Sequence, residues 1–236
     1  MQLDIMIGFS TGCFYKSLGM LDSLDLLRSK RIKAVELNFI KGVRGTPINQ
    51  LDALHFHGFD YVSLHAPIQT YGHNKETEET FAAINVLHTK RPLDLVVFHP
   101  DTVSDFSVFK GLDFPVAFEN MDNRKTGFKT PSDLWPLLSK DPKLSLVLDV
   151  NHAFTNDSTL KLVDMFYNEM CVFIAQIHLS GYRNGHQPLF QTRQKEIIKS
   201  IPTPFLEPII IESILDPKDI DRELEYVTNV FEETAN

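Results

Sequence analysis

The chain has 236 residues, of which 43% are hydrophobic and 23% are charged, and its formal net charge is −8. These values are ordinary for a globular domain, and the negative charge argues against a broad nucleic-acid surface. No stretch approaches the ~20 apolar residues of a membrane span, and we expect neither a signal peptide nor a membrane partner. The two cysteines lie in no motif, so we expect no disulfide framework, no cysteine zinc site and a cytoplasmic location.

Short apolar runs alternate with amphipathic segments along the chain. Runs rich in Val, Ile, Leu and Phe indicate strands that are buried on both faces, as in a parallel sheet. The predicted strands are Ile5–Ser10, Ala34–Phe39, Tyr61–His65, Leu95–His99, Val116–Glu119, Leu144–Asp149, Phe173–His178 and Ile209–Glu212. The predicted helices are Met20–Ser29, Ile48–His57, Lys75–His88, Ser132–Leu138, Thr159–Met170, Gln194–Ser200 and Asp219–Glu232. After the fourth strand, Val103–Lys110 is predicted as one or two turns.

The eightfold alternation predicts the fold class. A (β/α)8 TIM barrel typically needs ~250 residues, which suits one α/β domain over residues 1–236. A doubly wound open sheet is the alternative architecture. That alternative lacks support, because neither a GxGxxG motif nor a P-loop is present and eight even units favour closure.

A side chain that can bind a metal ion, either a carboxylate or an imidazole, ends each of the last four predicted strands: Glu119, Asp149, His178 and Glu212. Because the carboxyl ends of barrel strands converge on one rim, these side chains should meet in one small space. Carboxylates that close repel one another unless a cation lies between them, so we predict a divalent metal site. Oxygen-rich ligation with one imidazole suits manganese, magnesium or cobalt, and further imidazoles favour zinc. The alternative is that each residue is a separate cap or a solvated strand end.

Further histidines lie near the same rim. His65 and His99 end the third and fourth strands, and His152 follows Asp149 by three residues, in an expected loop above the barrel. His186 lies in the loop after the seventh strand. These imidazoles could bind a second and third metal ion or hydrogen-bond a polyol substrate. The remaining histidines are expected on the surface or in helix packing: His55, His57, His73 and His88.

The motifs SLHAP, VFHP, FEN, LDVNHAF, IHLS and IIES follow one another over Ser63–Ser213. Their order resembles the xylose-isomerase-like TIM barrel superfamily, which holds sugar isomerases, sugar epimerases and the endonuclease IV group of DNA-repair enzymes. The resemblance implies a metal core of four residues: Glu119, Asp149, His178 and Glu212. It also implies that Glu119 and Glu212 flank a sugar as catalytic acid and base, while the metal polarises the substrate oxygens.

The endonuclease IV branch adds imidazole ligands, for which this chain supplies His65, His99, His152 and His186. The string LDVNHAF is close to that branch. However, Asn184 stands where the branch has a loop Asp, and an amide is a poorer ligand than a carboxylate. The long tyrosine-bearing motif after the third strand is missing, and the loop after the seventh strand is short. DNA repair needs loops that enter the duplex and hold a flipped nucleotide, and the loops here are too short and not basic enough.

Three functional hypotheses follow. The first is a metal-dependent sugar or sugar-phosphate isomerase or epimerase, which needs one metal ion, two opposed carboxylates and a small closed pocket. Across the hypotheses the expected cofactor is one to three ions of zinc, manganese, magnesium or cobalt. The second is an endonuclease IV-like zinc phosphoesterase acting on nucleic acid, in which clustered ions make a hydroxide and stabilise the leaving oxygen. The third is a non-catalytic barrel, which buried unpaired carboxylates would destabilise. Nothing in the sequence marks an oligomeric state.

Candidate substrate contacts come from the rim. Predicted substrate-binding residues are His65, His152, Tyr182 and Arg183. Predicted aromatic walls are Phe14, Tyr15, Phe39, Tyr71 and Tyr182. Predicted phosphate contacts are Arg44, Arg183 and the local basic cluster Arg124, Lys125 and Lys129.

Overall fold

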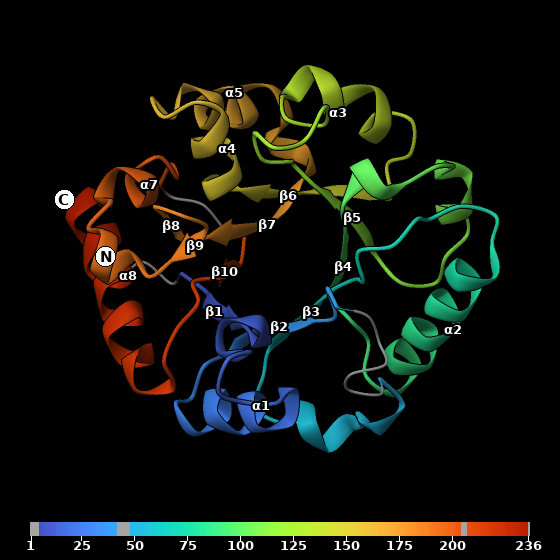
Figure 1. The fold of residues 1–236 in the computed structure, drawn as a ribbon, viewed down its shortest axis with the longest axis horizontal. Coiled ribbons are helices and arrows are strands. Elements are labelled where there is room, and N and C mark those ends of the chain that lie inside the picture. The colour runs from blue at the N-terminus through green and yellow to red at the C-terminus, as the bar shows by residue number, and fades with distance from the viewer. Residues whose placement is uncertain (1–4, 42–47, 204–206, 236) are drawn as a thin grey trace.

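The computed structural model describes residues 5–41, 48–203 and 207–235. Eight parallel strands form a closed barrel: β1 (Ile7–Ser10), β2 (Ala34–Asn38), β3 (Tyr61–His65), β4 (Leu95–Phe98), β5 (Val116–Glu119), β6 (Leu144–Asp149), β7 (Ile174–Leu179) and β10 (Ile209–Ile211). β1 closes the barrel by pairing with both β2 and β10 (Figure 1). The predicted TIM barrel is therefore confirmed, and the open-sheet alternative is wrong.

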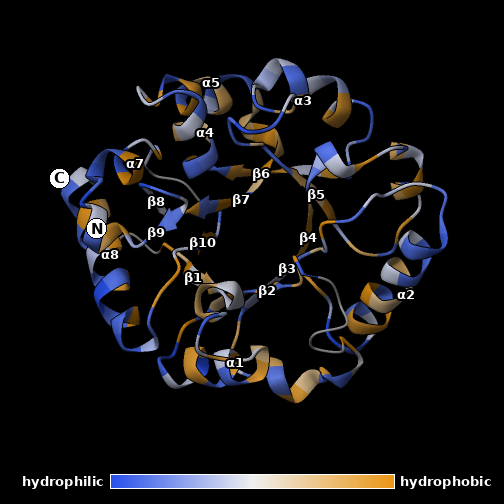
Figure 2. Ribbon diagram, in the orientation of Figure 1, coloured by the Kyte–Doolittle hydropathy of each residue, from blue (hydrophilic) through white to orange (hydrophobic). Residues whose placement is uncertain are grey.

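The helices surround the barrel (Figure 1): α1 (Met20–Ser29), α2 (Lys75–Lys90), α3 (Pro131–Leu138), α4 (Val150–Asn156), α5 (Lys161–Met170), α6 (Leu189–Thr192), α7 (Lys195–Lys199) and α8 (Ile220–Ala235). The strands are mainly apolar, whereas the helices carry polar and apolar residues on different faces (Figure 2). A large apolar cluster of strand and helix side chains forms the core. Of the helices described, none is both long enough and apolar enough to cross a bilayer.

One predicted helix is not formed, whereas a predicted short turn is present. Ile48–His57 was predicted as one helix but contains two short 3-10 helices, Ile48–Gln50 and Ala53–Phe56. The reason is local, because the Asp52 carboxylate accepts a hydrogen bond from the Leu54 N–H at 2.9 Å and starts a new turn. Val103–Lys110 holds one 3-10 helix, Phe106–Phe109, as a short-turn prediction allows.

His152 lies on a helix, not in a loop as predicted. α4 begins directly after Asp149, whose Oδ1 accepts a hydrogen bond from the His152 N–H at 2.8 Å. An Asp in this position caps the helix by satisfying a free N–H of its first turn. The strand-end carboxylate therefore also starts the following helix and fixes the height of His152 above the barrel.

The strand register places a layer of polar side chains inside the barrel. Asn38 pairs with His65, and Asp149 pairs with His178. Side chains alternate between the two faces of a strand, so residues two positions earlier point the same way, one step further from the rim. That deeper layer contains Glu36, Ser63 and Gln176, which are all buried. On the β4–β6 side the interior is instead filled by a separate apolar cluster of Leu95, Val97, Ala117 and Val147.

Asn120 joins the ends of β5 and β6. Its buried side chain donates from Nδ2 to the Asp149 carbonyl at 2.9 Å, and its Oδ1 accepts from the Asp149 N–H at 2.7 Å. The Asn120 carbonyl in turn lies 2.9 Å from His152 Nδ1. Asn120 therefore fixes the spacing of Glu119 and Asp149 at the rim.

We predict that Asn120→Ala lowers the free energy of unfolding by about 1–3 kcal/mol, because it removes two buried hydrogen bonds to the Asp149 backbone. Urea denaturation of both proteins measures the change. Asn123→Ala, at an exposed position three residues later, is the matched control and should stay within about 0.5 kcal/mol of wild type. Equal stability of Asn120→Ala and wild type would contradict this account of the rim.

Candidate metal centre and active site

The structure brings four strand-end residues together: Glu119, Asp149, His178 and Glu212. One ligand atom from each lies within 4.8 Å of the ligand atoms of the others. Glu119, Asp149 and His178 are buried, and the Glu212 side chain is 11% exposed. β5, β6 and β7 carry the first three, and Glu212 directly follows β10. This is the arrangement that convergence of the strand ends predicts, and we name these residues the four-residue group.

His178 lies at the centre of this group. Its Nδ1 is 2.8 Å from Glu119 Oε1 and 3.5 Å from Glu212 Oε2. Its Nε2 is 2.9 Å from Oε2 of Glu36, a residue of β2. Burial alone would lower the pKa of His178, but Glu212, Glu36 and Glu119 together raise it well above the ordinary value. The imidazole therefore serves as the local positive charge among these carboxylates.

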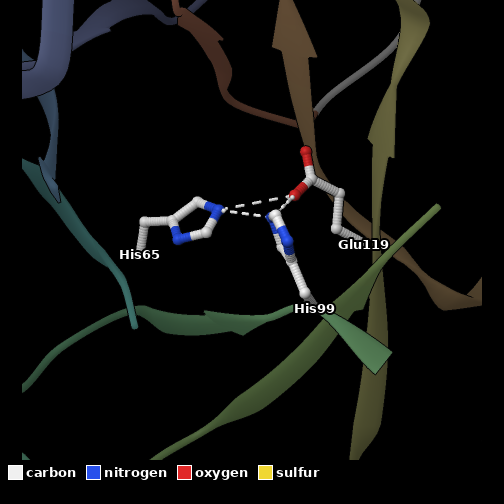
Figure 3. A group of neighbouring side chains, drawn as sticks. All are labelled: His65, His99 and Glu119. Atoms are coloured by element: carbon white, nitrogen blue, oxygen red, sulfur yellow. Dashed lines mark hydrogen bonds and ion pairs between the residues drawn. The ribbon is translucent and has the colours of Figure 1, made fainter. Parts of the chain in front are cut away.

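A second possible ligand group consists of His65, His99 and Glu119 (Figure 3). Glu119 Oε2 lies 2.9 Å from His99 Nε2 and 3.4 Å from His65 Nε2, and the two Nε2 atoms are 3.1 Å apart. His65 donates from Nδ1 to the Ala66 carbonyl at 3.1 Å, which leaves Nε2 for the centre of the site. Glu119 therefore belongs to both groups, with Oε1 towards His178 and Oε2 towards the histidine pair.

The carboxyl groups of the site have different pKa values. Burial would raise the pKa of Glu119, but His178, His65 and His99 hold it well below the ordinary value. Burial raises the pKa of Glu212 to about 8 despite the nearby His178, and Glu36 and Glu119 add to the rise. Burial also raises the pKa of Asp149 to about 6. Glu119 is therefore an anion near neutral pH, whereas Glu212 holds a proton unless a cation replaces it.

His152 and His186 lie beside the four-residue group but belong to neither possible ligand group. His152 Nδ1 is 3.4 Å from Asp149 Oδ2 and donates to the Asn120 carbonyl, which leaves Nε2 for a ligand. His186 Nδ1 lies 3.0 Å from the Ser180 hydroxyl and 3.9 Å from Glu212 Oε2. Burial lowers the pKa of His186 to about 4, with the nearby His152 adding to the effect. Both rings line cavities at the mouth, where they can contact a substrate.

The donor set fits a divalent cation. Asp149 Oδ2 and His99 Nδ1 are buried and have no hydrogen-bond partner. A buried carboxylate oxygen without a partner is costly, and a cation among three carboxylates would remove that cost. Three carboxylates and one imidazole match the preferences of manganese, magnesium or cobalt, and the adjoining histidines match those of zinc.

Two cavities open beside these ligands. One has a volume of about 510 Å³ and is lined by residues of both possible ligand groups: His65, His99, Glu119 and Glu212. The other, of about 490 Å³, is lined by Glu212, His186, Tyr15, Asn38 and Lys41 together with parts of the loops after β1 and β2. Both volumes lie within the range of small-molecule sites. Glu212 and His186 line both cavities, so the two cavities adjoin.

The predicted aromatic walls separate into two classes. Tyr15, which is 50% exposed, and Phe39 line the second cavity. Phe14 and Tyr71 are core residues instead, because each is at most 1% exposed. Tyr71 packs its ring on Phe81, Phe98 and Phe109, so the prediction of a wall there is wrong.

The predicted polar contacts are also divided. Tyr182 lines a third, smaller cavity together with Asn184 and His152, whereas the exposed Arg183 lines none of these three cavities. The basic cluster is engaged by the protein itself: Arg124 pairs with Asp122, Lys125 Nζ lies 2.6 Å from Asp101 Oδ2, and Lys129 Nζ lies 3.4 Å from the Asn123 carbonyl. Arg44 lies outside the described residues.

The sequence reasoning missed Glu36. It stands in the middle of the apolar run AVELNF and is 0% exposed. A signal was available, since a charged residue inside a fully buried strand must be paired or bound to a metal. Its partners could not be named from sequence, because His178 lies 142 residues further along the chain.

We predict that metal affinity decreases as the pH is lowered below about 8. Metal ligands must be deprotonated, and a cation must displace the proton that burial holds on Glu212, whose pKa is about 8. His178, whose pKa the neighbouring carboxylates raise well above its ordinary value, must also release its Nδ1 proton. Affinity should therefore fall by more than about tenfold per pH unit below pH 8. Calorimetric titration with Mn²⁺ or Zn²⁺ at several pH values, in two buffers of different ionisation enthalpy, measures the affinity and the proton release. The same affinity at pH 6 and pH 8.5 would contradict this picture of Glu212.

Comparison with known proteins identifies the fold. No family model matches the sequence, and no curated protein matches it. Among solved structures, an AP endonuclease, family 2, from Brucella melitensis is 12% identical, with a TM-score of 0.63 over 94% of this chain and 99% of that one.

Two further structures are similar. An IOLI protein with a binding zinc atom is 12% identical, with a TM-score of 0.64 over 98% of this chain and 96% of that one. A sugar phosphate isomerase/epimerase from Parabacteroides distasonis is 15% identical, with a TM-score of 0.57 over 95% and 91% of the two chains. The chain therefore has the same TIM-barrel fold as these proteins.

Proposed function

We propose that this protein is a divalent-metal-dependent isomerase or epimerase of a sugar or sugar phosphate. The observation that carries the proposal is the pair Glu119 and Glu212, which reach one compact four-residue group from different sides, with β6 and β7 between them. Both carboxyls line the cavity of about 510 Å³, which suits a small polyol. Structural neighbours that are named as a sugar phosphate isomerase/epimerase and as an L-ribulose 3-epimerase support the same interpretation.

The two glutamates suit opposite roles in proton transfer. Neighbouring carboxyl groups whose environments push their pKa values apart commonly divide the work of base and acid. Glu119, held as an anion by His178, His65 and His99, removes the proton from the substrate carbon. Glu212, which releases the proton that burial holds on it when the cation binds, takes up a proton from water and returns it to that carbon or its neighbour. The net result is inversion at that carbon or, for isomerisation, transfer of its hydrogen to the neighbouring carbon together with transfer of a hydroxyl proton to the carbonyl oxygen, with no external oxidant.

Four residues would hold the metal ion: Glu119, Asp149, His178 and Glu212. When bound, the ion supplies positive charge that polarises the hydroxyl and carbonyl oxygens of the substrate. His152 and His186, at the edge of the cavity, orient the substrate by hydrogen bonds. Tyr15 and Phe39 form apolar walls of the adjoining cavity, where Lys41 would supply positive charge to a substrate phosphate.

We predict that Glu212→Gln lowers proton exchange at the substrate carbon by about 10²–10⁴-fold, because an amide cannot return the proton, and that it weakens metal binding. A panel of ketoses and ketose phosphates is incubated in D₂O with Mn²⁺ or Co²⁺, and NMR measures deuterium entry. Glu78→Gln, at an exposed position on α2, is the charge-matched control and should exchange like wild type. Full exchange by Glu212→Gln would refute the proposed site.

A second candidate function rests on the histidine pair. His65, His99 and Glu119 form a ligand group next to the four-residue group, and such adjacent sites can hold clustered zinc ions that hydrolyse phosphodiesters. This favours an endonuclease IV-like phosphoesterase. Against it, two of the basic residues beside the cavities are already paired, Arg124 with Asp122 and Lys125 with Asp101, which weakens attraction for a phosphate backbone.

Metal stoichiometry separates the two functions. For the isomerase we predict about one exchangeable ion per chain in protein purified without added metal, because one compact group supplies four ligands. Elemental analysis measures the content, with Asp149→Ala as the control that should lose it. Two or three zinc ions per chain, lost in the control, would instead support the phosphoesterase, and abasic-site DNA would be the next substrate.

A further inference from the structure

We propose that Glu36 is a positioning residue for the metal centre: it holds the His178 ring so that Nδ1, and not Nε2, faces the cation. This inference rests on the proposed metal centre and goes beyond it, because Glu36 is not one of the four ligands. It assigns a role to a buried carboxylate that proton transfer does not use.

The contacts of Glu36 lie one layer below the ligands. The residue stands in the middle of β2 and is 0% exposed. Its Oε2 accepts hydrogen bonds from His178 Nε2 at 2.9 Å, from Gln176 Nε2 at 2.8 Å and from the Ser63 hydroxyl at 3.3 Å. All three partners come from other strands, so the barrel itself sets the position of this carboxylate.

The contact decides which nitrogen of His178 can bind a metal. A ring nitrogen 2.9 Å from a carboxylate oxygen is attracted to it only while that nitrogen carries a proton. In this structure both ring nitrogens meet that condition, because Nδ1 lies 2.8 Å from Glu119 Oε1. A cation held by Glu119, Asp149 and Glu212 would replace the proton on Nδ1, whereas Nε2, which faces Glu36 in the deeper layer, keeps its proton. A carboxylate behind a metal-binding histidine fixes the tautomer and the ring orientation and makes the ligand more basic.

Neighbouring side chains hold Glu36 in turn. The Tyr61 hydroxyl donates to Gln176 Oε1 at 2.9 Å, and the Gln176 amide nitrogen donates to Glu36. This chain of polar contacts runs from the lower part of the barrel up to His178. Because each donor in it is used, rotation of the carboxylate away from His178 would break several buried hydrogen bonds at once.

Space filling alone does not explain a carboxylate at this position. Oε1 of Glu36 is buried and has no hydrogen-bond partner, which is a cost to the fold. A buried ionic pair commonly stabilises a fold no better than apolar residues of similar volume. The buried carboxylate is explained if its role is to hold the His178 ring in the orientation that metal binding needs.

The first test compares metal affinity in wild type and Glu36→Gln. Chelator competition with Zn²⁺ and visible titration with Co²⁺ measure it directly. We expect binding weakened about 10–100-fold and a changed Co²⁺ spectrum, because the amide supplies no charge and can turn its NH₂ towards Nε2. Glu78→Gln is the charge-matched control, and thermal denaturation without metal shows whether each variant is folded.

The outcomes separate the inference from the function on which it rests. If wild type binds no metal, the proposed metal centre is wrong. If wild type binds metal and folded Glu36→Gln binds it equally well with the same spectrum, the role of Glu36 is wrong. A lower melting temperature with unchanged metal affinity also contradicts that role, since it indicates that Glu36 is purely structural.

A second measurement needs no folded Glu36 variant. In Zn²⁺-loaded wild type, ¹⁵N–¹H correlation of the imidazoles, with His178→Gln used for assignment, reports which nitrogen is protonated. A protonated Nε2 and a zinc-bound Nδ1 are expected. Coordination through Nε2 would overturn the proposal whatever the variant does.

Discussion

The crowding of charge at one end of the barrel is the constraint on which the rest depends. Glu36, Glu119, Asp149 and Glu212 share a buried space, where carboxylates repel one another strongly. His178 lies between Glu36 and Glu119, within 2.9 Å of an oxygen of each, and offsets part of the charge. The remaining negative charge is what a divalent ion would neutralise, and it adds to the burial that raises the pKa of Glu212 to about 8.

The barrel makes this crowding possible and also limits it. Parallel closure directs the carboxyl ends of all strands to one rim, so residues distant in sequence must meet there. Hydrogen bonds and helix capping then set the distances between the ligands. Asn120 fixes the Asp149 backbone by two hydrogen bonds, and Asp149 caps the helix that carries His152. The ligands are thus held by the scaffold before any cation binds.

Glu119 links the two functions that we consider. One oxygen faces His178 and the other faces the pair His65 and His99. With one ion in the four-residue group, the histidine pair is available to bind the hydroxyls of a sugar. With further ions, the same pair becomes a set of ligands. The residues beside the cavities favour a small substrate over a phosphate backbone, because Asp122 already pairs with Arg124 and Asp101 with Lys125.

Local sequence determined much of this architecture. Three strands have the predicted bounds: Tyr61–His65, Val116–Glu119 and Leu144–Asp149. They were predictable because a strand that is buried on both faces consists of a nearly continuous run of apolar residues. Each run also ends on the residue that reaches the site. Strand-end chemistry is therefore readable from sequence, and with it the meeting of the four-residue group.

Only the tertiary structure decided the remainder. Capping by Asp52 divides a segment whose hydrophobic periodicity predicts one helix. Capping by Asp149 starts a helix that the hydrophobic pattern does not predict. Glu36 acquired its role solely through closure, which brings β2 beside residues of β7 across the barrel interior. A sequence records that a buried strand contains a charge, but the partner of that charge depends on long-range geometry, which no local pattern encodes.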